Sequence, residues 1–221
     1  LDLSPLRLAE TAGFTGGISL RGNSGNYGIL SGVVNTPASE IQNSGSSDWT
    51  LNTAGGTWTT TRFVGAGKLI LGADNALATN ARVRWTAGTG VLDLAGHAQA
   101  VAGLSSEGAN GAITNNSAAA DSILTLSGLT ADYAYSGTIA NGSSHNVSLI
   151  MNSLGRTQTL TGANTYTGRT TITGGILAIG ADNGLGAPPS SRVADQLNLD
   201  GGALETTAGF TLDPNRGLTI T

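Results

Sequence analysis

Cysteine is absent from the 221-residue sequence, which excludes disulfide bonds, cysteine-ligated zinc and thiol nucleophiles. A chain without cysteine suits export through an oxidising compartment, where an early disulfide would block passage of the unfolded polypeptide. Chance loss of a rare residue explains the same absence, so cysteine content alone does not assign a compartment.

Charged residues are also scarce. They make up 11% of the sequence, against about 25% in an average globular protein, and the net charge is -4. Lys68 is the only lysine. The sequence therefore offers no basic surface for phosphate backbones, and a nucleic-acid partner is not expected.

Long apolar runs are missing as well. No stretch approaches the roughly 18 apolar residues of a membrane-spanning helix, so this segment is not expected to insert into a membrane. The residues from Leu1 to Pro5 contain no initiator methionine and no charged region followed by an apolar one. We interpret the chain as a processed or excised piece.

Aromatic residues account for only 5% of the sequence and hydrophobic residues for 39%, while glycine occurs 34 times and threonine 29 times. A core built from Leu, Ile, Val and Ala rather than from large rings suits a narrow, elongated interior. The low net charge and a mean hydropathy of +0.04 argue against a disordered chain.

Internal repeats are the most informative feature of the sequence. The letters LILGADNAL at residues 69–77 recur as LAIGADNGL at residues 177–185. Further along, VLDLAG at residues 91–96 resembles QLNLDG at residues 196–201. These recurrences indicate a repetitive architecture in which one structural unit is stacked on the next.

The two ends of the sequence also match each other, because residues 1–14 align without a gap with residues 197–210. The repeat pattern is therefore at the same point near the end of the sequence as at its beginning. We therefore expect residues 1–221 to form a single continuous solenoid segment, with repeat-like copies near 65–104 and 160–210, taken from a longer repetitive array.

Short strands of three to five residues are predicted along the chain, each with apolar side chains two residues apart and with Gly, Asn, Ser and Asp turns between them. The predicted strands are Leu6–Leu8, Leu69–Leu71, Leu92–Leu94, Leu124–Leu126, Val147–Leu149, Ile176–Ile179, Leu197–Leu199 and Leu218–Ile220. No helical stripe is present. Strands this short cannot bury a face alone, but coils stacked about 4.8 Å apart pair every strand above and below. The pattern predicts an all-β parallel solenoid of about nine to eleven coils, roughly 50 Å long. A β-sandwich is the alternative.

Residues 160–180, LTGANTYTGRTTITGGILAIG, resemble the autotransporter-associated β-strand repeat, also called the passenger-associated transport repeat. The resemblance extends over roughly residues 157–186, and the copy near 65–96 is degenerate. It implies a right-handed parallel β-helix (β-solenoid) within a large secreted or surface-displayed bacterial protein, such as an adhesin or a stalk. The family assigns no catalytic residue to the repeat.

Asp74 and Asp182 are the best candidates for a ligand site, because both recur within a Gly-Ala-Asp-Asn sequence. A carboxylate that caps its own tight turn explains this recurrence without a ligand, and this is the preferred interpretation. Calcium is the alternative, although one turn supplies too few oxygen ligands. Losing such a turn hydrogen bond is expected to cost about 1 kcal/mol, less than truncating an inward-facing residue, at about 2 to 5 kcal/mol. The predicted inward-facing residues are Leu69, Leu71, Leu177 and Ile179.

Catalytic motifs are not found. His97 and His145 are the only histidines, and each is predicted to lie in a solvated turn. The carboxylates that a glycosidase or lyase would need are scattered, at Glu40, Asp48, Asp93, Glu107, Asp121 and Asp132. The three tryptophans could stack against sugars or fill the core; they are Trp49, Trp58 and Trp85.

The sequence therefore predicts a non-enzymatic stalk, spacer or fibre segment of an extracellular or outer-membrane-surface protein, with no cofactor. A carbohydrate-active or glycan-binding β-helix is the alternative. The expected partners are further coils of the same chain or other copies stacking on both ends, with a host glycan or protein as a further possibility.

Overall fold

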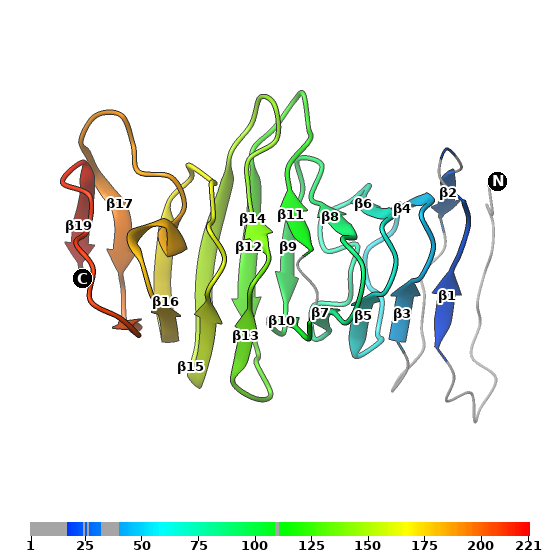
Figure 1. Ribbon diagram of the computed structural model, residues 1–221, viewed down its shortest axis with the longest axis horizontal. Helices are drawn as coiled ribbons and strands as arrows, with labels where there is room; N and C mark the ends of the chain where they lie inside the picture. The colour runs from blue at the N-terminus through cyan, green and yellow to red at the C-terminus, as the bar shows by residue number, and fades with distance from the viewer. Residues whose placement is uncertain (1–16, 24, 26, 32–39, 109–110) are drawn as a thin grey trace.

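The computed structural model describes residues 17–23, 25, 27–31, 40–108 and 111–221. Within them every strand pairing is parallel, which excludes the β-sandwich alternative. The strands stand side by side along the long axis, from β1 near one end to β19 at the other (Figure 1).

The strands form three sheets. The first contains β1 (Ile18–Leu20), β3 (Glu40–Asn43), β5 (Thr60–Phe63), β7 (Arg82–Trp85) and β10 (Leu104–Ser106). The second contains β2 (Tyr27–Leu30), β4 (Asp48–Leu51), β6 (Lys68–Leu71), β8 (Val91–Asp93), β11 (Ala112–Thr114) and β14 (Thr138–Ile139). The third contains β9 (Ala98–Val101), β12 (Ser122–Ser127), β15 (Val147–Leu160), β16 (Thr170–Ile179), β17 (Val193–Leu199) and β19 (Arg216–Ile220), with β13 (Tyr133–Tyr135) and β18 (Ala203–Thr206) paired to its long strands.

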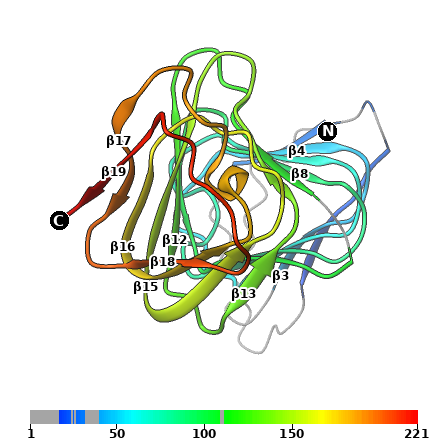
Figure 2. The same ribbon diagram turned by 60° about the vertical axis from the view of Figure 1, so that its left-hand side comes forward.

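The chain passes from one sheet to the next and returns, so that each circuit, here called a coil, stacks on the one before it. The described residues form a solenoid of about nine coils, as the sequence predicts. Figure 2 shows the coils closer to end-on, wrapped around a common interior. The right-handed sense of winding stays a prediction, in line with the general preference of parallel crossovers.

The interior is built from columns of side chains, because parallel pairing places equivalent residues of successive coils above one another. In the second sheet, Leu69 is in register with Trp49 of the preceding coil and Leu92 of the following one, and all three are buried. The predicted inward orientation is confirmed for four residues that are each at most 1% exposed: Leu69, Leu71, Leu177 and Ile179.

A stack of aromatic rings occupies the middle of this interior. The rings of Phe63 and Trp85 are parallel within 7° with their centroids 5.0 Å apart, and Tyr135 packs against Trp85 at 4.9 Å. All three side chains are fully buried. Burial raises the pKa of Tyr135, whose hydroxyl donates to the Gly111 carbonyl oxygen at 3.0 Å.

Two strands are much longer than predicted. β15 has 14 residues and β16 has ten, because each continues around a corner from the face of β12 onto the face of β13 and β18. The pairing of β15 with β16 shifts register at this corner, and Gly155 and Gly175 adopt positive φ angles of 69° and 77° nearby. The tight turn expected at Asp182 contains a 3₁₀ turn, η1 (Asp182–Leu185).

The recurring sequences at 69–77 and 177–185 lie on different faces of the solenoid. Residues 69–71 belong to β6 in the second sheet, whereas residues 177–179 belong to the half of β16 that pairs with β18. The recurrence therefore reflects a shared strand-and-turn chemistry rather than the same place in the coil. The first copy of the match between 1–14 and 197–210 lies outside the described residues, as does the strand predicted at Leu6–Leu8.

Candidate functional site

Buried amide side chains join separate coils where strand pairing is interrupted. β10 and β13 are not paired with each other, and Gln158 fills this gap. Its Nε2 donates to the Leu104 carbonyl oxygen at 3.0 Å, and its Oε1 accepts from the Leu104 N–H at 2.9 Å. Gln158 is fully buried, so the side chain replaces the backbone partners that Leu104 would otherwise lack.

Gln99 forms the same arrangement on another face. Its Oε1 accepts from the Leu77 N–H at 2.9 Å and its Nε2 donates to the Leu77 carbonyl oxygen at 3.2 Å. Asn164 connects three coils, because its Oδ1 accepts from the Ile139 N–H and its Nδ2 donates to the Gly184 carbonyl oxygen, both at 2.9 Å. These amides hold neighbouring coils at a fixed spacing.

Tyr166 and Asn164 explain the motif GANTYTG at residues 162–168. The Tyr166 ring is fully buried, and its hydroxyl lies 2.7 Å from Thr170 Oγ1. Burial raises the pKa of the Tyr166 hydroxyl to about 12. Gly186, at φ 81°, carries no side chain against Tyr166, since a Cβ there would lie 2.2 Å from the Tyr166 carbonyl oxygen. The motif is therefore explained by packing and hydrogen bonding between coils.

The sequence predicts that the Asp74 carboxylate caps its own turn, but the carboxylate instead reaches the next coil. Its Oδ1 accepts from the Ala98 N–H at 3.0 Å and lies 3.1 Å from Nδ1 of His97. The hydrogen bond from the Ala98 N–H, followed by that from His97, lowers the pKa of the Asp74 carboxyl below its usual value. The interpretation of Asp74 as the cap of its own turn is therefore wrong, because the backbone N–H group that it binds belongs to the following coil.

Asp121 and His145 repeat this geometry further along the solenoid. Asp121 Oδ1 accepts from the Asn146 N–H at 2.8 Å and lies 3.1 Å from His145 Nδ1. The hydrogen bond from Asn146 is the main cause that lowers the pKa of the Asp121 carboxyl, with a further contribution from His145. Both histidines, predicted to be solvated turn residues, are in fact half-buried partners in contacts between coils.

Asp182 has a different environment from Asp74, although the two sequences around them are alike. It forms a two-pronged ion pair with Arg216, with distances of 3.2 Å from Nε to Oδ1 and 3.1 Å from Nη2 to Oδ2. The Arg216 side chain is 1% exposed and also donates to the carbonyl oxygens of Leu185 and Gly186, each at 3.0 Å. Asp182 therefore neutralises a buried cation.

Five further carboxylates considered in the sequence are also held in contacts of their own: Glu40, Asp48, Asp93, Glu107 and Asp132. Within the described part of the chain, no group of three or more His, Cys, Asp or Glu residues lies together, and Asp74 and Asp182 share no site. Glu40 pairs with Arg62, Glu107 with Arg84, and the Asp93 carboxylate accepts from Asn116. Asp48 and Asp132 accept backbone N–H groups of the following coil, as Asp74 does.

The tryptophans fill the core. Trp49, Trp58 and Trp85 are 7%, 1% and 0% exposed, so none presents a flat face to a sugar. Among the described aromatic residues, Tyr27 is the one with a largely exposed side chain. No aromatic row follows the described surface.

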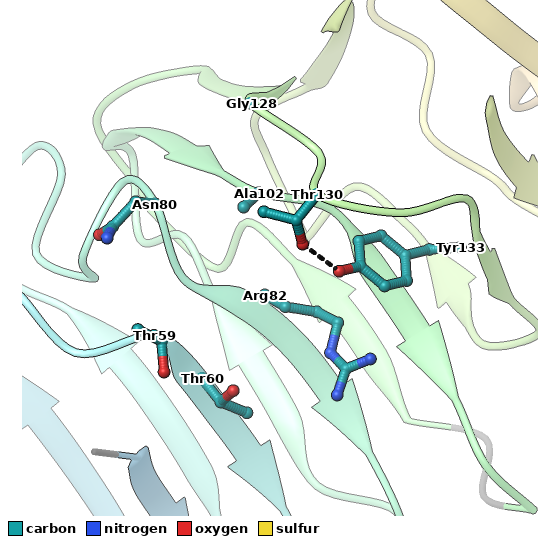
Figure 3. A pocket seen from close by; sticks show the side chains of 8 residues that line it. All are labelled: Thr59, Thr60, Asn80, Arg82, Ala102, Gly128, Thr130 and Tyr133. Atoms are coloured by element: carbon teal, nitrogen blue, oxygen red, sulfur yellow. Dashed lines mark hydrogen bonds between the residues drawn. The ribbon is translucent and has the colours of Figure 1, made fainter. Parts of the chain in front are cut away.

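A groove lined mainly by polar residues lies on the surface of the solenoid. Its volume is about 420 Å³, and it crosses four successive coils (Figure 3). Its polar walls are formed by Thr59, Thr60, Asn80, Arg82, Thr130 and Tyr133. The Arg82 guanidinium carbon lies 5.2 Å from the centroid of the Tyr133 ring, and the Tyr133 hydroxyl is 2.7 Å from Thr130 Oγ1.

Sequence reasoning did not single out these groove residues. The groove depends on a segment between β10 and β13 that is longer than those between the earlier strands of the first sheet, and on glycine at position 103. Val83 donates to the Gly103 carbonyl oxygen, so Gly103 lies beside Arg82 in the next coil. Only the register between coils reveals that Arg82 and Tyr133, far apart in sequence, are neighbours.

Part of the chain matches a known protein family. Residues 156–179 match the family model of the passenger-associated transport repeat. This range includes Gln158, Asn164 and Tyr166 and agrees with the resemblance seen in the sequence. No curated protein and no solved structure gave a significant match. In the described residues no helix has the length and apolar character needed to cross a bilayer.

Proposed function

Because residues 156–179 form a passenger-associated transport repeat, we propose that this chain is a structural spacer within the passenger of an autotransporter-like bacterial protein. The repeat implies association with such a passenger and a location at the cell surface or outside the cell. The finer proposal is mechanical. The segment keeps the parts of the passenger on either side of it at a set distance from each other. This role depends on the length of the segment and not on the side chains at its surface.

The stack of coils formed by the described residues is the observation that carries this proposal. Parallel backbone pairing runs through three sheets, and every coil depends on its neighbours for burial and for hydrogen bonds. Where strand pairing lapses, the amides of Gln99, Gln158 and Asn164 restore the missing contacts. A rod held together in this way has few points at which it can bend or be cleaved.

The contacts of the ionisable residues support a structural rather than a catalytic role. The passenger-associated transport repeat is not an enzyme family. The imidazole of each histidine contacts the carboxylate of an aspartate in the preceding coil. A hydrolase acting on glycosides needs two carboxylates facing one sugar. Glu40, Glu107, Asp93 and Asp132 instead hold arginines, an asparagine or a backbone N–H group of a neighbouring coil.

A segment exchange tests the proposal. In a surface-displayed passenger that carries this segment, residues 40–221 are replaced by an unrelated parallel solenoid with the same number of coils, and in a second version by one with half as many. Surface display and the reach of a distal epitope tag are measured by antibody binding and electron microscopy. The full-length replacement is expected to preserve both, whereas the half-length version shortens the reach.

Two results would refute the spacer proposal. Loss of display or reach with the full-length replacement, restored only by the native side chains, would show that the segment acts through specific surface chemistry. Turnover of pectin, alginate or chitin by the purified 221-residue chain would also overturn the structural proposal, provided that substitution of one carboxylate or histidine abolishes it.

A further inference from the structure

Arg82 is the distinctive residue of the polar groove. Four other arginines in the described part of the chain have carboxylate partners: Arg62, Arg84, Arg169 and Arg216. Arg82 has none among the described residues, as is also true of Arg21, Arg156 and Arg192, but Arg82 lines the groove and lies over the ring of Tyr133 (Figure 3). No carboxylate lines the groove, so this guanidinium is its one charged group.

Gly103 makes this arrangement possible. It occupies the position between Arg82 and Tyr133 on the stack of coils, and its φ of 114° belongs to the region that favours glycine. A Cβ at this position would lie 2.5 Å from Cδ2 of Tyr133. Because Gly103 has no side chain, the Arg82 guanidinium extends across it to the Tyr133 ring.

The position of Arg82 leaves its hydrogen-bond donors available. The donors of a guanidinium lie in its own plane, so a contact between its face and an aromatic ring does not occupy them. A planar guanidinium of this kind binds a carboxylate through two parallel hydrogen bonds. The aromatic contact also limits the orientations of the side chain, which lowers the entropy lost when a ligand binds.

Neutral polar groups surround this cation. Thr60 is in register with Arg82 on the neighbouring strand, and Asn80, Thr59 and Thr130 contribute further hydroxyl and amide groups. Hydroxyl and amide side chains both donate and accept hydrogen bonds, as the hydroxyls of a sugar do. The volume of about 420 Å³ lies within the range of roughly 300 to 1,000 Å³ found for small-ligand sites.

We infer that this groove binds an acidic saccharide, with the sugar carboxylate on Arg82 and the ring hydroxyls on the threonine, asparagine and tyrosine groups. This site goes beyond the spacer role, which does not depend on it. The four coils that form the groove place these groups in a row along the axis, so the site accommodates a short oligosaccharide lying parallel to the rod.

An extended acidic peptide fits the groove less well. Peptides that add a strand to a sheet need a free edge, and β7 is already paired with β5 and β10. The one interruption beside the groove, at Leu104, is closed by the amide of Gln158.

Binding is measured by isothermal titration calorimetry on the 221-residue chain. The probes are trigalacturonate and 3′-sialyllactose, with fully methyl-esterified trigalacturonate and lactose as their neutral counterparts and an acetylated triglutamate as an acidic peptide. At least one acidic saccharide is expected to bind more tightly than its neutral counterpart, and its affinity is expected to fall as salt is added. The substitution Arg82→Gln should weaken this binding roughly tenfold or more.

Arg62→Gln is the matched control. It removes the same charge from the neighbouring strand, where Arg62 pairs with Glu40 outside the groove, and should leave saccharide binding unchanged. Arg82→Lys retains the charge without the planar donors and should give an intermediate loss. Tyr133→Phe keeps the ring and removes only the hydroxyl, which tests the groove without altering its charge. Circular dichroism verifies that each variant is folded.

Three results would overturn the inference. The first is that neither acidic saccharide binds the unsubstituted chain. The second is that Arg62→Gln weakens binding as much as Arg82→Gln does, which would indicate a general charge effect. The third is that triglutamate binds as tightly as the saccharides with the same dependence on Arg82, which would assign the groove to acidic peptides. None of these results bears on the segment exchange that tests the spacer role.

Discussion

Replacing Asp182 with alanine would leave a cation buried without its counter-ion. The Arg216 side chain is 1% exposed, whereas the Asp182 side chain is 20% exposed and meets the guanidinium through two of its nitrogens. The carbonyl oxygens of Leu185 and Gly186 would still accept hydrogen bonds from Arg216, but they carry no full charge. Asp182→Ala also removes the acceptor for the Asp213 N–H, at 3.2 Å.

Breaking a buried ion pair from one side costs about 3 to 5 kcal/mol of unfolding free energy. Leu177→Ala is expected to cost about 2 to 5 kcal/mol, since Leu177 is fully buried. Asp74→Ala should cost at most about 1 kcal/mol, because its side chain is 69% exposed and solvent screens its contact with His97. The structure thus revises the sequence-based expectation for Asp182 and retains it for Asp74.

Urea unfolding followed by circular dichroism measures these differences, with hydrogen exchange of the residues around η1 as a local probe, because solenoids can unfold in parts. Asp74→Ala is the matched control. The double variant Asp182→Ala with Arg216→Met removes both charges and should recover much of the loss, as expected when the main penalty is an unpaired buried cation.

An unfolding free energy for Asp182→Ala within about 0.5 kcal/mol of the value for Asp74→Ala would refute this reasoning, because it would show that Arg216 finds water or another partner at little cost. A second contrary result concerns calcium. If added calcium stabilises the unsubstituted chain but not Asp182→Ala, the carboxylate is a metal ligand, and the ion pair with Arg216 is not its main role.

Three further outcomes are expected. Gln158→Leu should lower the unfolding free energy by about 2 to 6 kcal/mol in urea titrations, because both backbone groups of Leu104 lose their partner; a loss below about 1 kcal/mol would contradict this. Because the pKa values of Asp74 and Asp121 are lowered by folding, their ionised carboxylates stabilise the fold at pH values above the unfolded-state pKa of 3.8. Thermal stability should therefore decline below about pH 4, and it should decline less steeply when Asp74→Asn and Asp121→Asn are combined. The purified chain should self-associate in sedimentation experiments through β19, which ends its sheet with Leu218 48% exposed, and Leu218→Lys should reduce this association; a monomer at high concentration would argue against stacking.

The sequence alone was sufficient to predict the parallel solenoid, its approximate number of coils and the inward orientation of Leu69 and Ile179. These features follow from local patterns, since alternation with a period of two and turns rich in Gly and Asn act over a few residues. The repeat at 156–179 was likewise recognisable from its own letters.

Only the tertiary structure decided which side chains meet across coils. Asp74 contacts His97, 23 residues away, whereas Asp182 contacts Arg216, 34 residues away, and Gln158 reaches Leu104 across 54 residues. The loops between strands differ in length, so the neighbour of a residue along the axis does not lie at a constant separation in sequence. The two similar aspartates therefore have different roles, and the groove around Arg82 arises where the longer segment between β10 and β13 and the glycine at position 103 bring separate coils together.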